Sequence, residues 1–540
     1  MLEALVSKLM SGGKVSTELK TLQGATTMLA SYAAKDFNAA FATLVQALKQ
    51  IDTQEQRSPK KRAQAFIYSE DTARKYYKHL MSQLIRMLDA QDLAANSYYH
   101  MVLGFQEALI ECYRTLVFSQ PDAEKKLGRD ILGQLVCRSL LLLADKAFIQ
   151  YLRYESPDDA DWANANKFYA MAESAGFTHE LMPLYGTTTD SKTCEGEFLR
   201  MQILALSQPQ CFSPLQIAVL NDWLIKNMQF LSIDKEINPQ AHSFAINLQT
   251  AEPAVMLTRK ELGDGIRYLS TQSLIQRGGM VLKQLEQRTD LKSMGFPSSI
   301  APELVEGIFS RTTKCWSRSQ YPKRRDQRVT APEIGLLYQG VTALMASLKF
   351  KEGGANEPIK APSAAFDTRV HSRNGVTTVK VDESLLDERA PSSMWLVEDH
   401  SVYGLGLRQH NTVLQRPAIN DMVAVRFQNK LRVCVVRRIS MGQDDRQELG
   451  LEVLAVDPQL VMLRSSTGIT LEAVFAVGIE GTVRTRALLL PPHFEPRPDP
   501  YLLVYKGKEY KVQIDPQPKK FSGGNIFSFV IPDSAGQKKT

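Results

Sequence analysis

Apolar residues in the first part of the chain recur with the spacing of an α-helix. Phe37, Phe41, Leu44 and Leu48 follow one another at intervals of three or four residues, which places them on one stripe of a helix. Similar patterns recur over residues 70–90, 92–118, 122–153, 161–174, 195–207 and 214–230. Prolines fall between several of these stretches, where they can end or begin helices. The pattern predicts a bundle or a helix-pair solenoid.

A short extended stretch interrupts the helical pattern. Residues 237–258 include an alternating segment, and two further helices are predicted after it, over 263–288 and 301–312. We therefore expect one α-helical domain over residues 1–312.

The pattern changes to period two in the second part of the chain. Residues 421–427 and 431–437 alternate around a short polar turn, which predicts a β-hairpin. The segments 447–454 and 460–463 continue the alternation. An antiparallel barrel or sandwich is the architecture that this pattern favours for residues 313–475.

Two further segments complete the expected multidomain α + β organisation. Residues 351–391 are polar, contain proline and glycine and lack sustained periodicity, so we expect a flexible insertion within the β domain. Residues 476–533 alternate again and predict a second, small β domain, followed by a disordered tail over 534–540.

Composition agrees with a folded chain of several domains. The 540 residues are 44% hydrophobic and 23% charged, values that exclude wholesale disorder. The longest apolar run, 139–144, is far too short to span a bilayer, and residues 1–8 lack the features of a secretion signal. The six cysteines include no C-x-x-C pair, which indicates reduced thiols and no structural zinc site. We therefore expect a cytoplasmic protein.

The positive charge of the chain is concentrated in its second half. Residues 311–540 carry a net charge of +9, whereas residues 1–310 carry −2. The segment 311–330 alone holds seven basic residues against one acid, Asp326. A local field of this kind favours an anionic partner.

Local motifs for catalysis are incomplete. The segment Gly12–Ser16 resembles the end of a phosphate-binding loop, but its first glycine is missing and Lys14 is not followed by Ser or Thr. The segment Gly404–Gly406 lacks the third glycine of a dinucleotide-binding turn, and no G-x-S-x-G motif is present. We predict that the chain is not an enzyme.

Two short motifs in the β region suit the recognition of a guanine nucleotide. R-x-x-x-R consists of Arg324 and Arg328, and D-x-S-x-x-G consists of Asp399, Ser401 and Gly404. Guanidinium groups donate two hydrogen bonds to phosphate oxygens or to the O6/N7 edge of guanine, and they stack on bases. A carboxylate accepts hydrogen bonds from the opposite guanine edge, a serine two residues later faces the same side of a strand, and a glycine permits a tight turn.

This pair of motifs, together with its flanking strands, resembles the PilZ domain, a bacterial receptor module for cyclic di-GMP. The resemblance covers roughly residues 315–470, where the apolar run 334–344, the hairpin 421–437 and the segment 449–453 correspond to PilZ strands. It implies a six-stranded β-barrel that binds cyclic di-GMP and needs no other cofactor.

The resemblance also implies roles for single residues. The arginines would hold the phosphates and a guanine face of cyclic di-GMP, the aspartate and serine would read a guanine edge, and the glycine would permit the turn. Lys323 would add positive charge beside them. The ligand-binding residues implied in this way are Arg324, Arg325, Arg328, Asp399, Ser401 and Gly404.

A second R-x-x-x-R pair, Arg369 and Arg373, lies within the expected insertion. It precedes Asp399 by 26 residues, whereas Arg328 precedes Asp399 by 71. We favour the pair that contains Arg328, because a β-rich run follows it and the basic cluster surrounds it. The insertion would then form an enlarged loop between the two motifs.

The sequence thus predicts a bacterial signalling effector in which cyclic di-GMP, bound at the barrel, reorients a helical domain that binds a protein partner. The alternative is a helical scaffold protein whose PilZ-like barrel has lost its ligand. A nucleic-acid binder is disfavoured, because the aromatic residues near the basic cluster, Trp316 and Tyr321, do not form an interleaved stacking surface.

Overall fold

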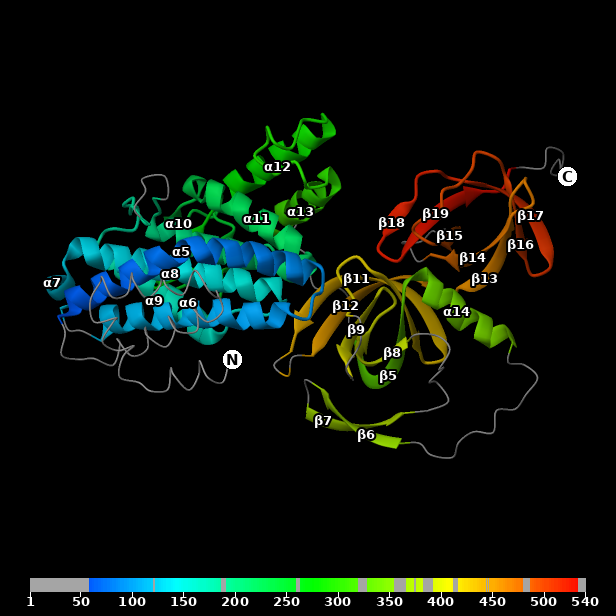
Figure 1. The fold of residues 1–540 in the computed structure, drawn as a ribbon, viewed down its shortest axis with the longest axis horizontal. Coiled ribbons are helices and arrows are strands. Elements are labelled where there is room, and N and C mark those ends of the chain that lie inside the picture. Colours follow the sequence, from blue (N-terminus) through cyan, green and yellow to red (C-terminus); the bar gives the residue numbers. More distant parts are fainter. Residues whose placement is uncertain are drawn as a thin grey trace, which may run out of the picture. The chain divides into compact units, whose positions relative to one another are not determined.

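The computed structural model describes most of the chain from residue 58 to residue 532 (Figure 1). Outside the description are residues 1–57, 120–121, 186–190, 259–262, 319–327, 354–365, 373–374, 382–391, 411–415, 443, 445, 479–485 and 533–540. The helix predicted over 37–48 and the tail predicted over 534–540 therefore lie outside the described residues. The chain divides into two compact units, Met1–Lys323 and Arg324–Thr540.

The first unit is helical and is built around α8 (Arg129–Leu152), as Figure 1 shows. Nearly every residue of α8 after Ile131 is buried, so its apolar run 139–144 belongs to the core of this unit. No helix among the described residues is long and apolar enough to cross a membrane. The helices that pack on α8 are α5 (Pro59–Asp89), α6 (Ala95–Phe118), α7 (Ala123–Leu127), α9 (Asp159–Ser174), α10 (Cys194–Leu206) and α11 (Pro214–Asn227). The helices predicted between residues 70 and 230 are therefore confirmed, except that the stretch 122–153, predicted as one helix, is divided at Gly128 into α7 and α8.

Buried ion pairs connect these helices. Arg200 on α10 is 1% exposed and donates to Asp145 on α8 at 2.7 Å, and Arg74 on α5 donates to the same carboxylate at 3.2 Å. Burial alone would raise the pKa of Asp145, but the two guanidinium groups hold it below its usual value. A change that removed Arg200 would leave Asp145 with Arg74 as its one arginine partner among these, and removal of one partner of a buried ion pair typically costs about 3–5 kcal/mol of stability.

A small antiparallel sheet follows α11. Its strands, in the order β1-β4-β2-β3, are β1 (Ile233–Asp234), β4 (Ile266–Leu269), β2 (Phe244–Asn247) and β3 (Val255–Met256). The helices α12 (Gln272–Glu286) and α13 (Pro302–Cys315) come next. The helix predicted to begin at residue 263 begins nine residues later, because a short, fully buried run such as β4 cannot be distinguished from a helical segment by periodicity.

Six strands of the second unit form a closed antiparallel barrel, the first of two. Their order is β10-β11-β12-β9-β8-β5. The predicted hairpin is confirmed, since β10 and β11 are joined by Gln428 and Asn429, which both have positive φ as a two-residue hairpin turn requires. The strands are β5 (Val329–Gln339), β8 (Ser392–His400), β9 (Gly404–Gln409), β10 (Met422–Phe427), β11 (Lys430–Met441) and β12 (Gln447–Val456).

The next strands form a second ring of six. The order β15-β14-β13-β16-β17-β19 is closed by pairing between β19 and β15, and β18 (Lys519–Phe521) pairs with residues 524–526 of β19. The strands of the ring are β13 (Gln459–Arg464), β14 (Thr470–Val477), β15 (Arg486–Leu490), β16 (Tyr501–Tyr505), β17 (Lys508–Ile514) and β19 (Gly524–Val530).

Two assignments made from the sequence are corrected by this topology. The apolar run 334–344 is a strand only as far as Gln339, where α14 (Gly340–Gly353) begins. The segment 460–463, which continues the alternation of the first barrel, lies in β13 and pairs with β14 and β16 of the second barrel. Within the expected insertion 351–391, β6 (Phe366–Ser372) and β7 (Gly375–Val381) form a separate two-stranded sheet.

The junction of β5 and α14 is held against the turn between β18 and β19. Val341 donates its backbone N–H to the carbonyl of Gly523 at 2.8 Å. A Cβ on Gly523, whose φ is +82°, would lie 2.9 Å from the Cα of Gly340. Side chains of α14 share a core with strand residues of both barrels: Val341, Leu344 and Leu348 pack with Val433, Val474 and Leu489.

This backbone contact predicts that Gly523→Ala lowers the stability of the second unit. A residue with a Cβ at positive φ costs about 1–2 kcal/mol, and the close backbone of Gly340 adds a steric term. Gly468→Ala is the matched control, because Gly468 also has φ +82° but has no atom within 4 Å of the position its Cβ would take. Urea unfolding followed by circular dichroism should show a larger loss for Gly523→Ala, and equal losses would contradict the contact.

Candidate functional site

Asp399 lies near the end of β8, where pairing to both neighbouring strands is irregular. It pairs with Thr330 on β5 and with Gly406 on β9. The register shifts beside it on both sides, between Thr330 and Glu333 on β5 and between Val397 and Asp399 on β8. Irregularities of this kind bend a strand and re-aim its side chains, as is common at the rims of barrels.

The tight turn that joins β8 to β9 carries the rest of the D-x-S-x-x-G motif. Ser401 donates its backbone N–H to the carbonyl of Gly404 at 2.8 Å, and the carbonyl of Tyr403 accepts from the N–H of Val453 on β12 at 2.9 Å. A Cβ at Gly404 would lie 3.2 Å from the carbonyl of Leu451, closer than most side chains tolerate. Glycine at this position therefore lets the turn lie flat against β12.

The second arginine of the R-x-x-x-R motif meets this turn. Arg328 immediately precedes β5, and its Nη1 donates to Oδ1 of Asp399 at 2.5 Å. The position of a Cβ on Gly404 lies 3.8 Å from Nη2 of Arg328 and 3.7 Å from Oγ of Ser401. Arg328, Asp399, Ser401 and Gly404, predicted from two motifs 71 residues apart, thus lie together at one end of the first barrel.

The ion pair between Arg328 and Asp399 is accessible to solvent. The two side chains are 38% and 33% exposed. An exposed pair of this kind contributes at most about 1 kcal/mol, so exchange of its hydrogen bonds for those of a ligand costs little. The guanidinium remains a donor for phosphate or guanine, and the carboxylate remains an acceptor.

Glycines that the sequence motifs do not include extend the site across the barrel surface. Gly406 pairs with Asp399 on one side and with Gly450 of β12 on the other. A Cβ at Gly406 would overlap the carboxylate of Asp399, and a Cβ at Gly450 would lie 3.2 Å from the Cβ of Arg438 on β11. We refer to Gly404, Gly406 and Gly450 as the glycine floor, because the Asp399 carboxylate lies over Gly406 and the Arg438 side chain lies over Gly450.

Two more basic residues lie beside the glycine floor. Arg438 is exposed and pairs with Gly450 across β11 and β12. Arg437 donates through Nε to Glu452 at 2.7 Å, and Glu452 is the β12 partner of Gly404. These arginines and the glycines at 406 and 450 were not predicted from the sequence. Gly406 could have been predicted from its spacing, because a residue two positions after Gly404 lies on the same face of a strand.

Several other residues singled out from the sequence lie outside the described residues or on another strand. Arg324, Arg325 and Lys323 lie outside the described residues, so their position relative to Asp399 stays a prediction. Arg369 is on β6, and its companion Arg373 is outside the description. No group of three His, Cys, Asp or Glu residues in the described part of the chain is arranged to hold a metal ion.

The aromatic neighbours of the motif belong to the barrel. Trp395 is fully buried and donates its Nε1–H to Oγ of Ser393 at 2.8 Å. The ring of His400 packs edge-on against Phe427, with 5.2 Å between ring centroids. Val402 and Tyr403, at the tip of the turn, are 65% and 40% exposed. The turn therefore presents apolar surface next to the polar site.

Comparison with known protein families gives a match within the first, helical unit. Residues 23–237 match the family described as cyclic-di-GMP receptor FimW, N-terminal domain. This match spans the helices α5 to α11 and ends before α12. No curated protein and no solved structure matches the chain. Over residues 23–237, less than half of its length, the chain is therefore similar to the N-terminal domain of the FimW family of cyclic-di-GMP receptors.

Proposed function

We propose that this chain is a non-enzymatic cyclic di-GMP receptor whose ligand binds at the rim of the first barrel, in the manner of a PilZ domain. Arg328 holds a phosphate or a guanine face, together with Arg324 and Arg325 from the segment before β5. The Asp399 carboxylate accepts hydrogen bonds from a guanine edge, and the Ser401 hydroxyl donates a hydrogen bond to it. The glycine floor lets the flat ligand approach the backbone closely.

The observation that carries this proposal is the contact of Arg328 with Asp399 at the turn that contains Ser401 and Gly404. The FimW match supports the same ligand independently, because it ends at residue 237 and includes no residue of the barrel. The two lines therefore rest on different parts of the chain.

Electrostatics favours a dianionic ligand at this site. Arg328 is balanced by Asp399 and Arg437 by Glu452, whereas exposed Arg438 has no carboxylate within 4.0 Å among the described residues. Two phosphates that approach Arg328 would release Asp399 to accept from the N1 and N2 donors of guanine. Phosphate binding would thus neutralise the Arg328 guanidinium and at the same time free the Asp399 carboxylate to recognise guanine.

The position of the site in the chain suggests how binding is transmitted. Arg324 and Arg325 lie in the stretch that connects α13 of the first unit to β5 of the second. A ligand held by these arginines and by Asp399 acts directly on this connection, and so reorients the helical unit toward a protein partner. Such a switch requires that the ligand bind one arrangement of the units more tightly than the other.

Single substitutions at the ion pair test the site. Arg328→Ala and Asp399→Ala should each weaken cyclic di-GMP binding about 10- to 100-fold, because each removes hydrogen bonds to a charged group. Isothermal titration calorimetry of the full chain measures this. Arg464→Ala is the matched control, since Arg464 forms an exposed ion pair with Glu509 in the second barrel. Unchanged affinity in folded Arg328→Ala would move the site away from the β8–β9 turn.

The glycine floor gives a second test. Gly406→Ala should displace the Asp399 carboxylate and weaken cyclic di-GMP binding at least tenfold, while the barrel stays folded because only the end of a flexible side chain must move. Gly104→Ala in α6 is the control, since its Cβ would meet no atom within 4 Å. Binding by Gly406→Ala as tight as by the control would show that the ligand does not contact Asp399.

A further inference from the structure

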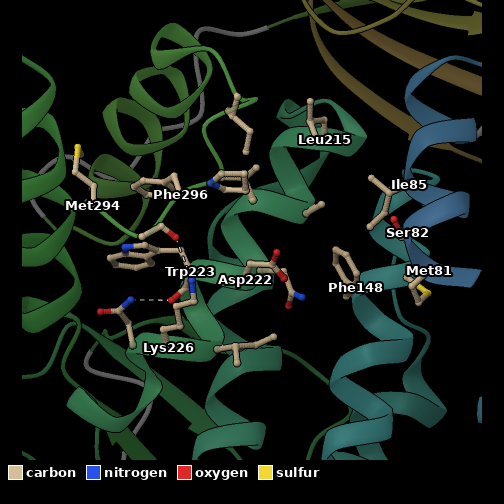
Figure 2. Close-up of a pocket in the computed structure, with 18 of the residues that line it drawn as sticks. Met81, Ser82, Ile85, Phe148, Leu215, Asp222, Trp223, Lys226, Met294 and Phe296 are labelled. Carbon is tan, nitrogen blue, oxygen red and sulfur yellow. Dashed lines mark hydrogen bonds between the residues drawn. The ribbon is translucent and has the colours of Figure 1, made fainter. Parts of the chain in front are cut away.

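An open cleft in the helical unit lies far along the chain from the nucleotide site. It is formed by α5, α11, α12 and the segment that connects α12 to α13, and its volume is about 1150 Å³. Figure 2 shows α11 at its centre, with Met81 and Ile85 of α5 on one side and Met294 and Phe296 on the other. The cleft lies wholly within the first unit.

The floor of the cleft is apolar and firmly supported. Trp223 of α11 is stacked on buried Trp316 at 5.9 Å between centroids and contacts Phe309 edge-on at 4.9 Å. Phe296 also packs on Phe309. These contacts fix the aromatic rings before any partner arrives, so little side-chain entropy is lost on binding.

Exposed apolar side chains line the mouth of the cleft. Ile225 is 37% exposed, Phe230 is 42% exposed and Met280 is 62% exposed. Arg277 lies over the ring of Phe230, with its Cζ 3.3 Å from the ring centroid. Clustered apolar surface surrounded by charge is typical of protein interaction sites.

The rim of the cleft is strongly basic. We define the basic rim as Lys78, Arg86, Lys226, Arg277 and Lys292. In the described part of the chain none of the five forms an ion pair within 4.0 Å, and the hydrogen bonds of Arg86, Lys226 and Arg277 go to carbonyl or amide oxygens. The acids of the lining are Asp222 and Asp145, and Asp145 is neutralised by Arg74 and Arg200.

We propose that this cleft docks an acidic amphipathic helix of a partner protein. The apolar face of that helix would lie on Trp223, Ile225 and Met280, and its acidic side chains would pair with the basic rim. Charge complementarity selects this partner, since the five cations of the basic rim outnumber Asp222, the one lining acid among the described residues that no arginine neutralises. An amphipathic helix meets both surfaces at once, through apolar residues at positions i, i+3, i+4 and i+7.

A displayed library of helical peptides, each about 16 residues and so about 24 Å long, tests the proposal on the full chain. Peptides selected for binding should carry apolar residues at helical spacing and a net negative charge. Fluorescence anisotropy then measures their affinity for variants. Met280→Glu, which places a carboxylate on the apolar mouth, and the double variant Lys78→Glu/Lys292→Glu should each weaken binding about tenfold or more.

Two controls test whether the loss of peptide binding is specific to the charges of the cleft. Lys167→Glu reverses an exposed charge on α9, away from the cleft, and should leave peptide affinity unchanged. A peptide in which lysines replace the acids should bind Lys78→Glu/Lys292→Glu more tightly than it binds the unmodified chain. Selected peptides that are not acidic, equal binding by all variants, or displacement by single-stranded DNA with a steep salt dependence would overturn the proposal. All measurements are made with and without cyclic di-GMP, so loss of nucleotide binding is scored separately from loss of peptide binding.

Discussion

The antiparallel pairing of β5 with β8 is the constraint on which the proposed nucleotide site depends. It places Thr330 opposite Asp399 and so brings Arg328 to the β8–β9 turn, across 71 residues of chain. Between the two strands lie α14 and the hairpin of β6 and β7. A shift of one residue in this register would turn every side chain of β8 to the opposite face. Closure of the barrel prevents such a shift, because β5 is also paired with β10.

The ion pairs that matter most are buried in the helical unit and exposed in the barrel. In the helical unit, Arg200 and Asp145 are buried, hydrogen-bonded to further partners and held in one arrangement. In the barrel, Arg328 and Asp399 are about one-third exposed and contribute little to stability. Buried pairs are expensive to break, whereas exposed pairs exchange partners readily. The unit with the rigid pairs carries the proposed docking cleft, and the unit with the exchangeable pair carries the proposed ligand site.

Much of this architecture could be predicted from the sequence, for identifiable reasons. The 3.6-residue period located α5 to α11, and period two located the hairpin of β10 and β11. Periodicity cannot say where an apolar run changes from strand to helix, so the break at Gly340 was missed. It also cannot say which sheet a strand joins, which is why β13 was grouped with the wrong barrel.

The candidate sites show the same limit. Asp399, Ser401 and Gly404 could be found because their spacing within one strand and turn is local, and Arg328 could be found because R-x-x-x-R is a local motif of its own. Gly450 lies opposite Gly406, and Arg438 lies opposite Gly450, only through the register of β9, β12 and β11, which cannot be read from the sequence. The cleft joins α5 to α11 and α12, which are separated by more than a hundred residues, and so required the folded structure.

The central proposal is that cyclic di-GMP binds at the end of the first barrel. Calorimetric titration of the full chain with cyclic di-GMP, with GTP and cyclic di-AMP as controls, tests this most directly. The account predicts saturable heat with cyclic di-GMP alone, and the stoichiometry gives the number of ligands at the site. A folded chain that gives no heat with cyclic di-GMP, or equal heat with all three nucleotides, would contradict it.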